Sequence, residues 1–371
     1  MKKKIIVSVI SDLVTDQRVQ KECTTLHDMG YEVFLIGRKS TKDFGLDKLP
    51  FKVLRLWDPF KKGALMYAFF NAQLFIYLCF RKADILWAND LDTLLPNFLV
   101  SRIKKVVLIY DSHEYFLLTV AKAFSRKIFT SIEQYIFPKL AHVLTVNNSI
   151  RNIYQSAYKV PITVIRNVPY RSTGFHASIL PADHANKKIL LMQGIGLNEN
   201  RGAEEAVEMM QFLPDEYILY FIGTGTLIGK LKEMVSRLNL SAKVIFTGVL
   251  PYDVMMGFTL QAYLGLIFEK IDHNDEHMLA LPNKLFDYIK AGLPILSSKG
   301  VEIMAIVDAF DIGTYIDDLN PEHIAQRVLA IGADQEKYYR WKQNTKHAAA
   351  ELNWENEEVI LISFMRNVDR K

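Results

Sequence analysis

The sequence of 371 residues contains little cysteine and has a nearly balanced charge. Cys23 and Cys79 are its only cysteines, and neither they nor any group of His and Cys residues has the spacing of a metal site. This usage indicates a reduced, cytoplasmic setting. A formal net charge of +4 is too small to indicate a nucleic-acid partner, so we expect none.

Several signals that would define other classes of protein are also absent. No GxxxxGK[ST] loop occurs, so the sequence does not indicate phosphoryl transfer from ATP. The first apolar run, residues 5–10, is too short for the apolar region of an export signal, and we interpret it as a β-strand. The composition is that of a globular protein, with 50% hydrophobic and 23% charged residues, and the length predicts two domains or one large domain.

One apolar stretch, residues 64–80, has two interpretations. It is flanked by Lys61-Lys62 and Arg81-Lys82, it is slightly short for a membrane span, and it contains Asn71 and Gln73. The favoured interpretation is a buried helix packed on a sheet. The alternative is a helix whose aromatic side and basic ends lie against an anionic membrane surface, which would place a cytoplasmic protein at the inner face of the membrane.

Strands and helices alternate along most of the chain. In the first half we expect strands at 5–10, 32–37, 53–55, 85–88, 106–111, 143–146 and 163–166, with helices at 18–29, 64–80, 92–102, 117–139 and 149–158. Residues 168–188 lack periodicity and are interpreted as a linker. Strands then follow at 189–193, 217–223, 244–247, 262–268 and 294–297, with helices at 202–210, 227–238 and from 283.

This rhythm predicts an α/β protein with two doubly wound domains, residues 1–169 and 170–353. After Pro321 the chain is mostly helical, and we expect the last helix, within 354–371, to pack back on the first domain. Doubly wound sheets bind ligands at the carboxyl ends of their strands. Two such domains facing each other are therefore expected to bind their ligands in a central cleft.

Polar residues follow three strands of the first domain. They are Ser11, Asp12, Asp16, Gln17 and Arg18, then Asn89, Asp90 and Asp92, then Asp111, Ser112, His113 and Glu114. Each group is also consistent with a helix cap, because Asp, Asn and Ser are favoured there. His113 lies between two carboxylates at the end of a buried strand. Expected to be neutral at pH 7, it would donate to or accept from a sugar hydroxyl or a backbone carbonyl.

In the second domain, residues 281–298 predict a short helix followed by a buried strand. Asn283 is expected to cap the helix, and Gly292 with Pro294 to end it. Lys284 and Asp287 share one face of the first turn, away from the apolar face. At a helix N-terminus such a pair suits a ligand with a phosphate end and a hydroxyl-bearing sugar, although a solvated salt bridge is the simpler alternative.

Glycines follow two earlier strands of this domain. Gln193-Gly194-Ile195-Gly196 ends one strand, Gly223-Thr224-Gly225 ends the next, and Arg201-Gly202 opens a helix. Glycines let a diphosphate approach the backbone, and an arginine at a helix start can bind it with two hydrogen bonds. The pattern is weaker than a dinucleotide fingerprint because the third glycine is absent.

In order and spacing these motifs resemble the GT-B glycosyltransferases, which have two Rossmann-like domains. Within them the sequence is similar to the retaining, nucleotide-sugar-dependent family 4 enzymes of bacterial surface-polysaccharide synthesis. The resemblance covers nearly the whole chain. It rests on residues 16–19, 88–94, 110–114, 166–169, 193–194 with 201–202, and 281–294.

The resemblance implies a sugar transfer from a nucleoside diphosphate donor to a hydroxyl of a glycan or lipid-linked glycan, with retention and without a metal or other cofactor. His113 would contact the donor sugar, and Arg201 and Lys284 would stabilise the leaving diphosphate, so these three would be catalytic. The resemblance places the donor on Gly194, Gly196, Arg201, Gly223, Gly225, Asn283, Lys284 and Asp287, with Asp287 on the ribose. It places the acceptor on the first domain, at Asp16, Arg18, Asp90 and Glu114.

The sequence departs from the family at three points. Leu279 stands at the first position of the paired-Glu motif, Ile195 and Gly196 stand where a second cation is usual, and residues 12–18 lack a glycine pair. Two other functions are therefore weighed. One is a nucleotide-sugar epimerase of the same architecture, with acid–base carboxylates such as Asp12, Asp90 or Glu114. The other is a catalytically inactive subunit that binds a nucleotide sugar, for which Leu279 is the motive.

Overall fold

The computed structural model describes residues 2–11, 13–14, 16–39, 46–60, 63–119, 123–171, 180–270 and 278–370. Asp12 and residues 271–277 therefore lie outside the described residues. The chain forms two compact units, an N-terminal unit of Met1–Asn167 with Glu357–Lys371 and a C-terminal unit of Val168–Asn356. The sequence analysis places the acceptor on the first domain and the donor on the second, and both assignments remain predictions.

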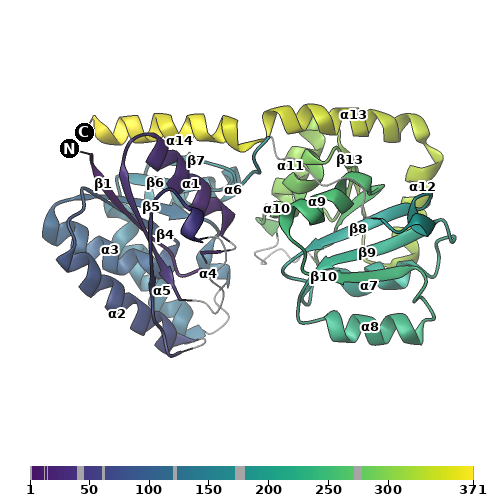
Figure 1. The fold of residues 1–371 in the computed structure, drawn as a ribbon, viewed down its shortest axis with the longest axis horizontal. Coiled ribbons are helices and arrows are strands. Elements are labelled where there is room, and N and C mark those ends of the chain that lie inside the picture. Colours follow the sequence, from purple (N-terminus) through teal and green to yellow (C-terminus); the bar gives the residue numbers. More distant parts are fainter. Residues whose placement is uncertain are drawn as a thin grey trace. The chain divides into compact units, whose positions relative to one another are not determined.

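A seven-stranded parallel sheet forms the centre of the N-terminal unit, in the order β3-β2-β1-β4-β5-β6-β7 (Figure 1). Its strands are β1 Lys4–Ser8, β2 Glu32–Arg38, β3 Lys52–Leu56, β4 Ile85–Asn89, β5 Val107–Ser112, β6 His142–Thr145 and β7 Ile162–Val164. The helices are α1 Gln17–Asp28, α2 Ala64–Phe80, α3 Leu91–Lys104, α4 Phe116–Thr119, α5 Ala123–Ile136 and α6 Asn148–Tyr158, with short turns η1 Leu46–Lys48 and η2 Phe137–Lys139. The strand order reverses between β1 and β4, which is where such sheets bind ligands.

The inner side of α2 is part of the core. Met66, Phe70, Leu74 and Leu78 recur one turn apart and are buried. The last three of them pack against Ile6, Ile36 and Leu86 of the sheet. The interpretation of this stretch as a helix packed on a sheet is therefore confirmed. Figure 1 shows α2, α3 and α5 on one face of the sheet, and α1 on the other. Among the described residues, no helix combines the length and the apolar character that crossing a membrane would need.

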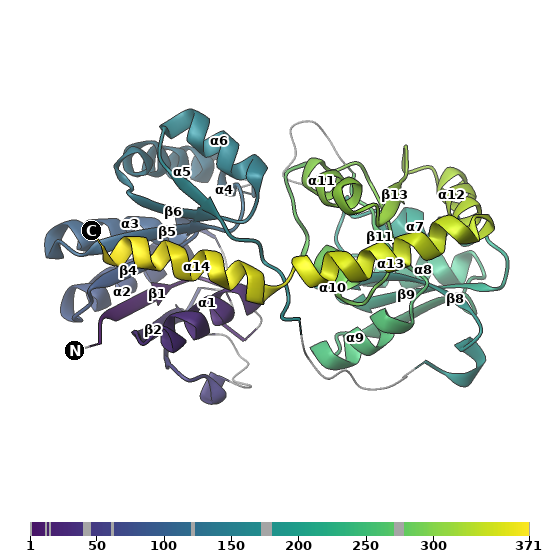
Figure 2. The same cartoon turned by 90° about the horizontal axis from the view of Figure 1, so that it is seen from above.

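The last helix, α14 Trp354–Asp369, lies along the N-terminal unit (Figure 2). Glu357 forms an ion pair with Arg166 at 3.0 Å, and Thr25 of α1 donates a hydrogen bond to Glu358 at 2.7 Å. Asp369 near its end accepts a hydrogen bond from Lys3 at 2.8 Å. These contacts bring the end of the chain back to the sheet on which it began.

The C-terminal unit contains a six-stranded parallel sheet in the order β10-β9-β8-β11-β12-β13. Its strands are β8 Lys188–Gly194, β9 Tyr217–Gly223, β10 Val244–Gly248, β11 Leu264–Ile267, β12 Ile295–Ser297 and β13 Gly313–Tyr315. The helices are α7 Ala203–Met209, α8 Ile228–Arg237, α9 Tyr252–Gln261, α10 Asn283–Lys290, α11 Val301–Phe310, α12 Pro321–Ala333 and α13 Gln335–Glu351, preceded by the turn η3 Ala182–His184. Here the order reverses between β8 and β11, so the residues that follow these two strands lie at the switch point.

Three elements of this unit are not predicted by the sequence, namely α9, α11 and β13. Helix α9 has apolar residues on most of its circumference, and Met256, Gly257, Phe258 and Thr259 are consecutive buried residues. A helix buried on several sides lacks the alternation between an apolar and a polar face that sequence patterns detect. Its first residue, Tyr252, belongs to the candidate site.

Candidate active site

In the N-terminal unit, a buried network surrounds His113 beyond the end of β5. Its ring nitrogens lie 3.4 Å from Asp90 and 3.3 Å from Asp111, and its backbone N–H donates to Asp90 at 2.8 Å. Asp111 in turn accepts two hydrogen bonds from Nη2 of Arg18, both at 3.0 Å. Arg18 of α1, Asp90 after β4 and Asp111 of β5 thus lie together where the strand order reverses between β1 and β4.

The two carboxylates change the expected charge of His113. Burial alone would lower the pKa of the imidazole, but Asp90 and Asp111 outweigh it and raise the pKa from 6.5 to about 10. The expectation of a neutral His113 at pH 7 is therefore wrong. Burial would also raise the pKa of Asp111, but the charges of Arg18 and His113 hold it below its usual value. His113 is thus a charged hydrogen-bond donor rather than a base.

The backbone at Asp90 is strained. Its φ of 58° and ψ of 166° lie in a region that is nearly restricted to glycine, yet the position carries an aspartate. The conformation is held by a hydrogen bond from the N–H of Asp90 to the carbonyl of Asp111 at 2.8 Å, and it lets the carboxylate accept from the N–H of His113. The Asp90 side chain makes no capping hydrogen bond to α3. These observations favour the site interpretation of Asp90 over the cap interpretation.

Two residues predicted to bind an acceptor have structural partners instead. Arg18 is 2% exposed, and its guanidinium also donates to the carbonyl of Ile165 at 2.7 Å and pairs with Glu22 at 3.0 Å. Because it has no surface to offer a ligand, the prediction that Arg18 contacts an acceptor is corrected. Asp16 caps α1 by accepting from the N–H of Val19 at 3.2 Å, and it also accepts from Ser11.

Glu114 is exposed beside this network, and its backbone carbonyl accepts from the Ser112 hydroxyl at 2.8 Å. Its charge acts on Asp92, whose pKa is raised well above its usual value, first by burial and then by Asp90 and Glu114. The Asp90 side chain is 18% exposed and Glu114 is exposed, so an acceptor hydroxyl could reach both carboxylates. Neither position is excluded by burial.

Glu22, Asp111 and His113 could together suggest a metal site, since they offer ligand atoms within 4.8 Å of one another. The guanidinium of Arg18 already forms ion pairs within this cluster, with its Nη2 atom 3.0 Å from both Glu22 and Asp111. A divalent cation would have to displace a buried guanidinium from its hydrogen bonds. The donor set therefore fits an internal ion-pair network rather than a metal.

In the C-terminal unit, the structure brings Arg201 and Lys284 together through a residue that the sequence did not predict. Nη1 of Arg201, just before α7, lies 2.7 Å from Oε1 of Glu269, which is buried at the end of β11. Burial lowers the pKa of the Lys284 amine, with Glu269 opposing and Arg201 reinforcing this effect. Arg201 is thus paired with Glu269 at the switch point between β8 and β11, and the charges of both residues act on the Lys284 amine.

Asp287, on the first turns of α10, belongs to a second network at the end of β8. It accepts hydrogen bonds from the Gln193 amide at 3.2 Å and from the Tyr252 hydroxyl at 2.9 Å. Gln193 is held in turn by a hydrogen bond from Thr259 of α9 at 2.9 Å. The Asp287 carboxylate is therefore oriented toward the glycine loop that follows Gln193. Gln193 and Tyr252 fix its position without a contact to Lys284.

The four predicted glycines fall into two groups. A Cβ on Gly223 or Gly225 would meet the carbonyl oxygen of Gly194 at 1.9 Å or of Leu197 at 2.1 Å, so these glycines allow the two neighbouring loops to pack. A Cβ on Gly194 or Gly196 would meet nothing within 4 Å. The first pair is thus explained by packing of the chain on itself, whereas the second borders open space at the strand end.

The start of α10 differs from the expectation. Pro282 is the N-cap residue and makes no side-chain capping bond, while Asn283 is the first residue of the helix and is exposed. The prediction of an Asn283 cap is therefore wrong. The end is as predicted, with Gly292 at a φ of 68°. The N-terminal end of α10 carries the partial positive charge of the helix dipole.

Several solved structures have the same fold. Sucrose-phosphate synthase from Thermosynechococcus elongatus is 15% identical, with a TM-score of 0.79 and coverage of 100% of both chains. Anabaena HepE, in complex with UDP and glucose, is 13% identical, with a TM-score of 0.75 and again full coverage. A putative UDP-N-acetylglucosamine 2-epimerase from Listeria monocytogenes is 13% identical, with a TM-score of 0.65 and 95% of each chain covered.

Fold similarity alone therefore does not separate transferases from epimerases, and the curated proteins give no match. Family models do separate them. Residues 17–168 match the model of Glycosyltransferase Family 4, and residues 181–348 match that of Glycosyl transferases group 1. These two matches follow one another along the chain and correspond to its two sheets. The protein is a GT-B glycosyltransferase with a family 4 N-terminal half and a group 1 C-terminal half.

Proposed function

We propose that this glycosyltransferase transfers a sugar from a nucleoside diphosphate donor to a hydroxyl of a glycan or lipid-linked glycan, with retention and without a metal. The observation that carries the proposal is the cluster of Arg201, Glu269 and Lys284 at the switch point of the C-terminal sheet. The leaving group of such a transfer is a diphosphate, which gains negative charge as the glycosidic bond breaks. Two cations and the N-terminus of α10 stabilise that charge without a metal ion.

Asp287 is proposed to bind the donor ribose. A carboxylate has about four acceptor sites, so it can accept a ribose hydroxyl in addition to Gln193 and Tyr252. Tyr252 and Gln193 then act as positioning residues that fix the carboxylate. Gly194 and Gly196 leave space for the diphosphate beside the backbone, while Gly223 and Gly225 support their loop.

In the N-terminal unit, His113 is proposed to donate a hydrogen bond to the transferred sugar, as the resemblance to family 4 implies. Its positive charge makes it a hydrogen-bond donor to a sugar oxygen and does not suit a general base. Asp90 and Glu114 are proposed to accept hydrogen bonds from the acceptor. Retention is proposed on the resemblance alone, as is a cytoplasmic location at a membrane that carries the lipid-linked acceptor.

The test is a thermal-shift screen of the purified protein with UDP, GDP, CDP, TDP and their sugars. A ligand that binds only the folded state stabilises it by about 2.7 kcal/mol at a hundred times its Kd. We expect a shift with one base, lost in Asp287→Asn and kept in Asp317→Ala, an exposed aspartate of the same unit. No shift with any nucleotide would contradict the proposal. Release of nucleoside diphosphate only in the presence of acceptor separates transfer from epimerisation.

A further inference from the structure

Trp57, directly after the end of β3, is an exposed aromatic residue at the carboxyl edge of the N-terminal sheet. All four tryptophans of the chain lie within the described residues, and Trp87, Trp341 and Trp354 are at most 2% exposed. Trp57 is 60% exposed. A single exposed apolar residue is common on protein surfaces, so exposure alone does not indicate a site. What distinguishes Trp57 is that the surrounding residues hold it in one position.

The chain segment that carries Trp57 is fixed by hydrogen bonds. Its carbonyl accepts from the Gln73 amide of α2 at 2.8 Å. The side chain of the next residue, Asp58, is fully buried and accepts from Nε of Arg38 at 3.1 Å and from the N–H of Phe60 at 2.8 Å. A buried carboxylate is costly without a partner. The pair with Arg38, at the end of β2, therefore allows Asp58 to order this surface turn.

The indole ring is held as well. Phe69 of α2 packs against it with ring centres 6.1 Å apart and planes at 80°, and Phe60 packs against Phe69 at 5.7 Å. Trp57 nevertheless exposes more than half of its surface. A ring that is already immobile loses little conformational freedom when a ligand packs on it, so such a ring is preorganised for binding.

Polar side chains connect Trp57 with the proposed acceptor site. The pKa of Tyr67 of α2 is raised, first by burial and then by the charges of Asp92 and Glu114, whereas the charge of Arg38 opposes this rise. Tyr67 therefore lies within electrostatic reach both of the carboxylates that follow β4 and β5 and of the guanidinium that orders the Trp57 segment. Because the strands are parallel, these strand ends share one edge of the sheet. Arg38, Tyr67, Asp92 and Glu114 thus form a polar row along this edge.

The two ends of the polar row are farther apart than the two sides of one sugar ring. Strands β2 and β1 lie between β3 and β4, so three strand spacings of about 4.8 Å, about 14 Å in all, separate the end of β3 from the end of β4. A monosaccharide at Asp90, after β4, therefore does not reach Trp57, whereas a chain of two or three sugars does.

We propose that Trp57 stacks on a sugar of the acceptor other than the one that receives the transferred sugar. This inference rests on the proposed function, and it makes the acceptor an oligosaccharide rather than a monosaccharide. The broad indole face suits the C–H face of a pyranose ring, and the polar row suits the hydroxyls at the rim of the sugars. A lipid surface or an apolar peptide would use the ring but would make no use of the polar row.

The test uses the difference in exposure among the tryptophans. An array of glycans with one to four sugars first gives the trisaccharide that the protein binds most strongly. This trisaccharide is then added in solution, with its terminal monosaccharide as the comparison. Acrylamide should quench the fluorescence of Trp57 in the free protein, whereas the three buried tryptophans are shielded. The bound trisaccharide should protect Trp57 from acrylamide, and the monosaccharide at saturation should not.

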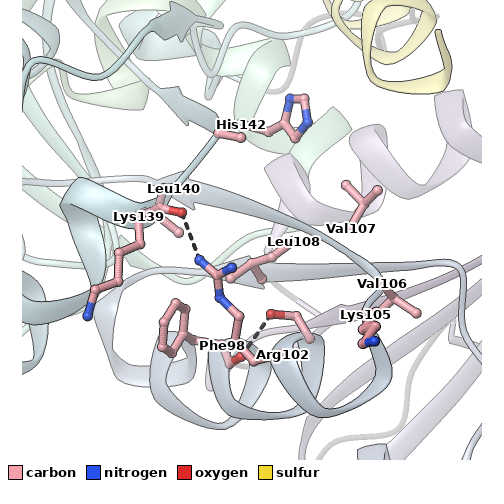
Figure 3. A pocket seen from close by; sticks show the side chains of 11 residues that line it. Phe98, Arg102, Lys105, Val106, Val107, Leu108, Lys139, Leu140 and His142 are labelled. Carbon is pink, nitrogen blue, oxygen red and sulfur yellow. Dashed lines mark hydrogen bonds between the residues drawn. The ribbon is translucent and has the colours of Figure 1, made fainter. Parts of the chain in front are cut away.

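Variants of Trp57 test its contribution to affinity. Trp57→Ala should weaken binding of the trisaccharide about tenfold, the loss expected for one aromatic contact, and should leave the affinity for the monosaccharide unchanged. Trp57→Phe keeps a ring and should restore most of the affinity. The matched control is Tyr135→Ala, because Tyr135 is 63% exposed in the same unit. Tyr135 packs against Phe98 and Lys139, which line the pocket of about 380 Å³ in Figure 3, at the amino ends of β5 and β6 and so at the opposite edge of the sheet.

All three variants should keep the thermal shift given by the donor nucleotide, which separates this inference from the proposed function. Equal trisaccharide binding by Trp57→Ala and wild type would overturn the inference and leave the donor site as proposed. A tenfold loss for the monosaccharide as well would overturn it by placing Trp57 at the first acceptor sugar. Binding of no glycan, by a protein that still shifts with nucleotide, would contradict both the inference and the glycan acceptor. Release of Trp57→Ala from phosphatidylglycerol vesicles, with glycan binding unchanged, would assign Trp57 to a lipid contact instead.

Discussion

Replacing Arg18 by methionine should destabilise the N-terminal unit strongly, although Arg18 touches no expected ligand. Its guanidinium supplies hydrogen bonds to Asp111, Glu22 and the Ile165 carbonyl, and Asp111 has no exposed surface. Methionine keeps most of the apolar volume of the side chain but removes the cation. Asp111 and Glu22 would then be buried without the charge that compensates them.

The expected cost is about 3–5 kcal/mol, which is typical when one partner of a buried ion pair is removed. This free-energy cost should become smaller as the pH falls. The pKa of Asp111 is held below its usual 3.8 in the folded protein, so this carboxylate stabilises the fold above that pH and the contribution is lost as the pH falls further. Without Arg18 the buried Asp111 would have a higher pKa, so the difference between wild type and Arg18→Met should be largest at neutral pH and should narrow as the pH falls.

Urea denaturation monitored by tryptophan fluorescence measures this, since Trp87 lies in β4 of the same unit. Asp111→Asn is the matched variant, and the double variant should be more stable than the sum of the two single changes by about 1–3 kcal/mol. The ion-pair network does not stabilise the fold as argued if the free energy of unfolding of Arg18→Met lies within about 1 kcal/mol of wild type. Additive effects of the two changes would lead to the same conclusion.

Other predictions address His113 and the glycine loops. Because the folded pKa of His113 is about 10 against 6.5 unfolded, its charge stabilises the fold fully below pH 6.5 and this contribution is lost as the pH rises towards 10. Denaturation across this range should show a decline that becomes shallower in Asp90→Asn, and an unchanged slope would contradict the pairing. Gly223→Ala should destabilise the C-terminal unit, because its Cβ would lie 1.9 Å from a carbonyl oxygen. Gly196→Ala should leave thermal stability within about 1 kcal/mol of wild type and weaken donor binding instead, as measured by the nucleotide-induced shift.

Much of the fold follows from short-range patterns. Strand β9, Tyr217–Gly223, has the predicted bounds, and the alternation of buried strands with amphipathic helices gives the doubly wound architecture of both units. The left-handed conformation of Gly292 at the end of α10 was also predictable, because glycine adopts this helix-ending conformation without a steric penalty. Such features depend on residues within one or two turns of each other.

The parts of the site that were not predicted depend on residues distant in sequence. Asp111 lies two residues before His113, but the charge of His113 also depends on Asp90, which lies 23 residues earlier in the chain. Glu269 follows a strand without any motif, and only the pairing of β11 with β8 brings it to Arg201. Tyr252 lies 35 residues before Asp287 and begins a helix that periodicity does not reveal.

The charge balance of the donor site leads to a last expectation. Ile195 stands where the family has a further cation and is 70% exposed, while Glu269 offsets one of the charges of Arg201 and Lys284. Burial lowers the pKa of Lys284, and an arriving diphosphate would favour the charged amine and so raise that pKa again. Donor binding should therefore take up protons and weaken as the pH rises towards 10.5, the ordinary pKa of lysine. Lys284→Arg keeps its charge throughout this range, so its nucleotide affinity should show less of this decline, and the nucleotide's own ionisation is common to both proteins. Parallel pH profiles for wild type and Lys284→Arg would show that Lys284 does not contact the phosphates.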